Sequence, residues 1–80
     1  MPGTLAEIVR RKLHAGTLPH EQPLKLWANV GSGKPCTACD APIVPSQTEY
    51  EAQYYDGRPP IFLHVACHQL WEVERNRVRV

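Results

Sequence analysis

The sequence predicts a small α+β domain, and three observations support this class. Apolar side chains recur at helical spacing over residues 4–15. Residues 48–54 alternate between two faces like a strand, and a turn and a second apolar run follow. Two cysteines lie three positions apart near the middle of the chain, and a histidine and a cysteine with the same spacing lie near its end. The chain has 80 residues, so we expect a single domain, 1–80, with a small core.

Residues 4–15 predict an N-terminal amphipathic helix. Thr4 and Glu7 have the spacing of a capping box, and Gly16 follows as a C-terminal stop. We expect the apolar stripe to pack on the rest of the domain, and a partner-binding helix is the alternative. The stripe consists of Leu5, Ile8, Val9 and Leu13.

The rest of the chain divides into a connector and a core. Residues 17–35 contain three prolines and predict an irregular connector, with at most one helical turn around PLKLWAN. Residues 36–77 form the predicted core. In it TEYEAQY and IFLH pair as a β-hairpin across the turn DGRPP, and VACHQLWEVERNR is a helix. We expect Ala66, Leu70 and Val73 on one face of this helix, with Trp71 beside them, and Glu72, Glu74 and Arg75 exposed.

The stretch GSGKPCTACD, residues 31–40, allows several interpretations. A phosphate loop is excluded because the glycines are too close together and Pro35 stands at the Ser/Thr position. A zinc deaminase needs an upstream H-x-E, and neither His14 nor His20 provides one. A thiol redox couple needs a βαβ context, which the flanking sequence lacks. A metal site remains.

The four predicted metal ligands are Cys36, Cys39, His64 and Cys67. They form C-x2-C and H-x2-C pairs, and they use all three cysteines of the chain. Three thiolates and one imidazole are typical of a closed, tetrahedral, structural zinc site, so we predict one Zn²⁺. His68 is the alternative fourth ligand. We favour His64 because positions i and i+3 of a helix share a face with Cys67, whereas adjacent positions do not.

A zinc knuckle, a hairpin and a helix with the last ligands make up the treble-clef arrangement. Within it, residues 36–71 resemble the poly(ADP-ribose) polymerase-type zinc finger. The ligands match that family, Ile43 and Pro45 match its I-P, and Trp71 falls near its aromatic. The resemblance implies a zinc-stabilised treble clef. The whole chain also resembles a set of short bacterial proteins with an N-terminal helix before such a core, which implies a bacterial origin.

These features predict a non-enzymatic binding module with no catalytic residues and no small-molecule substrate. Four protein ligands leave no coordination position for water, and we find no catalytic set of side chains. The near-zero net charge of +1 favours a protein partner. The alternative partner is nucleic acid, bound through basic clusters at 10–12 and 75–79. We see no membrane span and no secretory signal, and clustered cysteines favour a soluble protein of the cytoplasm.

Overall fold

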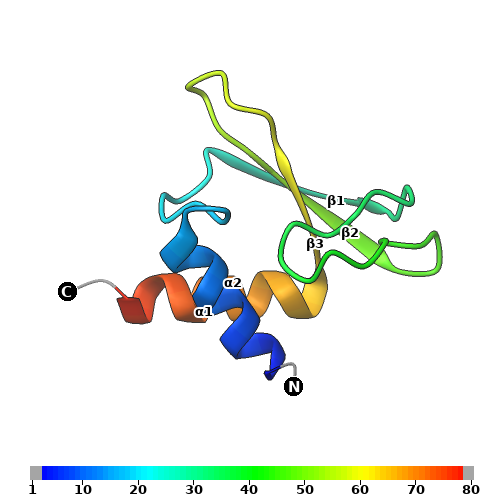
Figure 1. Ribbon diagram of the computed structural model, residues 1–80. Coiled ribbons are helices and arrows are strands. Elements are labelled where there is room, and N and C mark those ends of the chain that lie inside the picture. The colour runs from blue at the N-terminus through cyan, green and yellow to red at the C-terminus, as the bar shows by residue number, and fades with distance from the viewer. Residues whose placement is uncertain (1–2, 79–80) are drawn as a thin grey trace.

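The computed structural model describes residues 3–78 as two helices and a three-stranded antiparallel sheet (Figure 1). Both helices lie on one side of the sheet, whose strand order is β1-β2-β3. The predicted α+β class is confirmed. Arg79, part of the predicted C-terminal basic cluster, lies outside the described residues. The elements are α1 (Leu5–Ala15), β1 (Lys25–Val30), β2 (Thr48–Gln53), β3 (Ile61–His64) and α2 (Val65–Val78).

Helix α1 begins and ends where its local sequence predicts. The Thr4 hydroxyl accepts a hydrogen bond from the Glu7 N–H, and the Glu7 carboxylate accepts one from the Thr4 N–H. Gly16 ends the helix in the left-handed conformation, with φ of 81°. Val9 and Leu13 are buried, and α1 packs against α2. The apolar stripe therefore belongs to the core and is not free for a partner.

The prediction of an irregular connector over 17–35 is wrong for six of its residues. Strand β1 pairs with β2 along its whole length, from Lys25 opposite Gln53 to Val30 opposite Thr48. The segment is rich in apolar and aromatic side chains, and β2 has a free edge because β3 occupies only its other side. Among the helices and strands within residues 3–78, β1 contacts only β2, and all six of its residues are exposed.

The predicted buried face of the C-terminal helix is also wrong. Helix α2 buries Cys67, Trp71, Glu74 and Arg75, whereas Val73 is 52% exposed. Three side-chain contacts explain this difference in the buried face. The Trp71 indole N–H donates to the Pro19 carbonyl at 2.9 Å, so the ring points into the core. Glu74 and Arg75 can be buried because each forms an ion pair, Glu74 with Arg10 and Arg75 with Glu72.

The core lies between the helices and the sheet and extends to the cysteines. Its largest apolar side chains come from both helices, β3 and the two long loops. None of the helices in the described part of the chain is long and apolar enough to cross a lipid bilayer. The buried apolar residues include Leu13, Leu18, Ile43, Leu63 and Trp71, beside Cys36 and Cys67.

Candidate metal centre

The four predicted ligands come together at one end of the sheet. One side-chain donor atom from each of Cys36, Cys39, His64 and Cys67 lies within 4.8 Å of all the others. The His64 Nδ1 is 3.4 Å from the Cys39 sulfur and 3.9 Å from the Cys67 sulfur. Zinc bonds of about 2.3 Å to sulfur and 2.0 Å to nitrogen place such atoms about 3.6 Å apart in a tetrahedron. The residues are therefore placed to hold one metal ion.

A tight loop presents the first two cysteines. The Asp40 N–H donates to the Cys36 carbonyl, and the Cys36 N–H donates to the Ala41 carbonyl, both at 2.8 Å. A β-bridge between Pro35 and Pro42 closes the base of this loop. Asp40 has a φ of 70°, a conformation that Asp tolerates better than most residues. The loop thus turns back on itself and brings both sulfurs to one side.

The loop is fastened to β3 and to α1. The Thr37 N–H donates to the Phe62 carbonyl at 2.8 Å, and the Phe62 N–H donates to the Thr37 hydroxyl at 3.3 Å. From α1, the Lys12 ammonium donates to the Thr37 carbonyl at 3.0 Å and to the Asp40 carboxylate at 2.8 Å. These contacts place the cysteine loop against the end of β3. The sequence carried no signal for them, because they join segments about 25 residues apart.

His64 is the last residue of β3 and not part of the helix, which corrects one detail of the prediction. Cys67 is the third residue of α2, so the two ligands flank the strand–helix junction. The His64 Nε2 lies 3.2 Å from the Pro42 carbonyl. Because a carbonyl oxygen can only accept, this hydrogen bond requires the proton on Nε2, and Nδ1 is then free to bind a metal ion. Such a hydrogen bond orients a ligating imidazole and increases its basicity.

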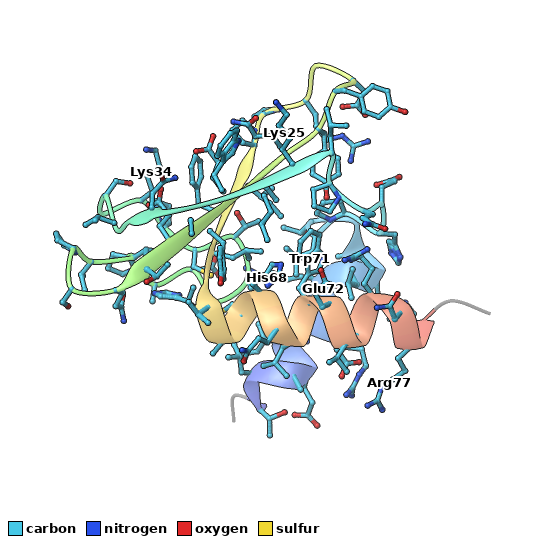
Figure 2. The ribbon with its side chains drawn as sticks, turned by 180° about the vertical axis from the view of Figure 1, so that it is seen from behind. Lys25, Lys34, His68, Trp71, Glu72 and Arg77 are labelled. Carbon is cyan, nitrogen blue, oxygen red and sulfur yellow. The ribbon has the colours of Figure 1, made fainter. Side chains whose placement is uncertain are left out.

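His68, the alternative fourth ligand, lies elsewhere. Figure 2 shows it between α2 and the sheet, beside Trp71. Its ring centroid is 4.8 Å from that of Tyr50, and its Nε2 is 3.6 Å from the Glu72 carboxylate. Burial lowers the pKa of His68, which favours a neutral ring packed against aromatic neighbours. The choice of His64 agrees with this geometry.

The surroundings of Cys36 and Cys67 shift the pKa of each thiol in opposite directions. Burial works against a charged Cys36, but hydrogen bonds from loop N–H groups and from His64 outweigh it and lower its pKa to about 7. Burial, followed by the charges on Cys36 and Cys39, raises the pKa of the Cys67 thiol. Three thiolates in so small a space therefore repel one another, and a divalent cation among them removes this penalty.

The ligand cluster is reachable from one side. A hollow of about 580 Å³ is lined by Cys39, His64 and Cys67 together with neighbouring apolar residues such as Leu5 and Pro42. Cys36 is fully buried, whereas Cys39 and His64 are half-buried. An ion or a chelator can thus enter from the Cys39 side without opening the core.

Comparison with protein-family models, with curated proteins and with solved structures finds no match to this chain. The resemblance to the poly(ADP-ribose) polymerase-type finger therefore rests on the ligand spacing and the few flanking residues alone. The structure itself defines the class. It is a small α+β protein with a possible metal site of three cysteines and one histidine.

Proposed function

We propose that the protein is a zinc-stabilised, non-enzymatic binding module with one structural Zn²⁺. The observation that carries the proposal is the Cys₃His cluster, with its donor atoms within 4.8 Å of one another. Thiolate and imidazole donors favour zinc over calcium or magnesium, which prefer oxygen. The order of cysteine loop, β2–β3 hairpin and α2 supports a treble-clef core, to which α1 and β1 are additions.

A closed donor set also supports a non-catalytic role. Lewis-acid and zinc-hydroxide chemistry require a coordination position for water or substrate, and four protein ligands occupy all positions of a tetrahedral ion. The metal would then act through stability. Structural zinc contributes about 10–16 kcal/mol in small fingers, as much as the whole net stability of about 5–15 kcal/mol of a typical domain.

The ion pairs formed by the two basic clusters support a protein partner over nucleic acid. Four cations of the two clusters form ion pairs within the molecule. Arg10 and Arg77 contact Glu74, Lys12 contacts Asp40, and Arg75 contacts Glu72. These side chains do not offer an unpaired basic row to phosphates. The exposed apolar side chains of Leu24, Leu26, Trp27 and Val30 instead gather on and beside β1. Surfaces of this kind contact other proteins.

A metal analysis tests the first part of the proposal. Purified, folded protein should contain one zinc per chain, measured by elemental mass spectrometry against the protein concentration. Alanine at Cys39 should remove the zinc, whereas alanine at His68 should leave it bound. Folded protein without metal would reject the structural role. Hydrolytic activity that depends on the zinc of the intact four-ligand site would reject the non-catalytic role.

Nucleic acid remains a second candidate, through a different surface from the predicted clusters. Trp27, Glu51 and Phe62 face one another across the three strands on the side away from α2. The Lys25 ammonium lies 5.6 Å from the Trp27 ring centre, and that of Lys34 lies 4.8 Å from the Phe62 ring centre. Both lysines project from this face in Figure 2. Aromatic rings with nearby lysines can stack on bases and contact phosphates.

Titration with labelled single-stranded DNA and RNA separates the two candidates. Binding through this face should weaken steeply with salt, and each lost phosphate contact should flatten the slope of log K against log salt by about 0.7. Lys25→Ala and Lys34→Ala should each show this effect, and Arg11→Ala is the matched control. No binding at low salt would remove the nucleic-acid candidate. The bacterial origin and the cytoplasmic location stay predictions.

A further inference from the structure

We propose that two copies of this chain associate through the free edge of β1, forming one continuous antiparallel sheet. The proposal deepens the binding function above by naming the partner. It rests on that function only in so far as the folded sheet must be present.

The edge of β1 is the accessible edge of the sheet in residues 3–78. The outer side of β3 is taken by the cysteine loop, through the hydrogen bonds between Thr37 and Phe62. Beyond β1, on the side away from β2, no helix or strand of the described part of the chain follows. An edge strand presents a row of backbone donors and acceptors that another strand can pair with.

The ladder register shows which backbone groups face outward. The Gly31 N–H donates to the Gln47 carbonyl at 2.9 Å, in line with the β1–β2 register. Since alternate residues of an antiparallel strand face the same neighbour, Lys25, Trp27 and Asn29 direct their N–H and C=O groups at β2. The N–H and C=O groups of Leu26, Ala28 and Val30 consequently point outward.

This outward set is self-complementary about a two-fold axis through Ala28. Antiparallel pairing there places Leu26 opposite Val30 of the second copy, Ala28 opposite itself, and Trp27 opposite Asn29. The three outward pairs would exchange about six hydrogen bonds, two for each pair. All three outward residues are apolar and share one face of the sheet, so their side chains would form a single strip across both copies.

The exposure and charge of the strand agree with this arrangement. Leu26 and Val30 are 41% and 71% exposed, so a monomer leaves their apolar surface in contact with water. Natural edge strands are usually protected by a proline, a bulge or a central charge. Here Pro23 and Pro35 lie outside the strand, and its only charge is Lys25 at one end. The two lysines of a pair would lie about 20 Å apart, so like charges do not meet.

Light scattering after size exclusion, over a range of protein concentrations, tests the proposal on the zinc-loaded chain. The mass should rise from that of the 9.0 kDa chain toward twice this value. Ala28→Pro removes an outward N–H at the axis without removing a bond to β2, so the fold should persist. We expect the dimer to weaken at least about tenfold. Asn29→Ala, which keeps every backbone donor, is the matched control.

Two further readouts make the outcome decisive. Concentration-dependent amide shifts should concentrate in residues 24–30, which distinguishes β1 pairing from a dimer formed elsewhere. Zinc content is measured on the same samples. A monomer with one zinc per chain at the highest concentration would overturn the dimer alone, as would an Ala28→Pro variant that dimerises like the wild type. A β1-paired dimer without metal would overturn the zinc proposal and support this one.

Discussion

Removal of the metal should unfold the whole protein and not only the cysteine loop. The four ligands connect three parts of the chain, namely the loop at 35–42, the end of β3 and the first turn of α2. Cys67 and Trp71 lie one helical turn apart on the buried face of α2, so the ligand set and the core share one helix orientation. Loss of the ion therefore releases both the loop and the helix that carries the largest core side chain.

The expected magnitude supports complete unfolding. Structural zinc is worth about 10–16 kcal/mol in small fingers, whereas typical domains have net stabilities of about 5–15 kcal/mol. A folded apo protein would have to hold three thiols and one imidazole within 4.8 Å of one another with no cation among them, which adds to the cost of keeping the fold. His64→Ala should lower zinc affinity by more than the 10–100-fold typical of losing a residue that only orients a ligand. His64→Cys restores four donors and should regain binding.

Tryptophan fluorescence can report this transition. Trp71 is fully buried, whereas Trp27 is 48% exposed, so the Trp27→Phe background isolates the buried ring. Chelation should shift its emission to longer wavelength, with loss of helical circular dichroism, and added zinc should reverse both changes. His68→Ala serves as control and should need as much chelator as its parent. A native spectrum at zero measured zinc would refute the reasoning.

Three other predictions concern the packing around the site. Trp71→Ala should destabilise the zinc-loaded protein by about 3–5 kcal/mol in urea, and a loss below about 1 kcal/mol would contradict its place in the core. The Arg10 hydrogen bond lowers the pKa of Glu74 below its ordinary value of 4.5. The ion pair between Arg10 and Glu74 therefore stabilises the fold above pH 4.5, and this stabilisation is lost as the pH falls through the lowered pKa. The difference in Tm between wild type and Glu74→Gln should narrow below pH 4.5. A difference that stays constant with pH would argue against the pair. Gly31→Ala would bring a Cβ into a clash with the Val44 carbonyl oxygen. The Cβ of Gly33→Ala meets nothing within 4 Å, and this variant strains only a backbone φ of 85°. The Gly31 variant should therefore lose more Tm by calorimetry, and equal losses would contradict the close approach.

The features that could be predicted from the sequence depend on local spacing. The capping box of α1 involves residues three positions apart, and both ligand pairs are set by the same short spacing. The alternation of residues 48–54 and the turn after it likewise predict β2 and β3. In each case the neighbours that decide the structure are neighbours in the sequence.

The features that could not be predicted depend on distant partners. Strand β1 forms because β2, about 23 residues further on, offers a free edge. Helix α2 buries Glu74 because Arg10, 64 positions earlier, reaches its carboxylate with two hydrogen bonds of 2.9 and 3.2 Å. A periodicity argument ranks charged side chains as exposed, and it cannot register a partner on another helix.

The N-terminal basic cluster shows how this changes the functional interpretation. Arg10 and Lys12 leave α1 in different directions, the first toward Glu74 on α2 and the second toward Asp40 and Thr37 in the cysteine loop. Together they fasten α2 and the cysteine loop to α1. The sequence predicts that this basic cluster can contact phosphates. In the structure, two of its three side chains instead hold α2 and the cysteine loop against α1. Of its three residues only Arg11 is exposed and has no ion pair within the described chain, so the cluster offers one unpaired cation and not the row of three that the sequence indicates.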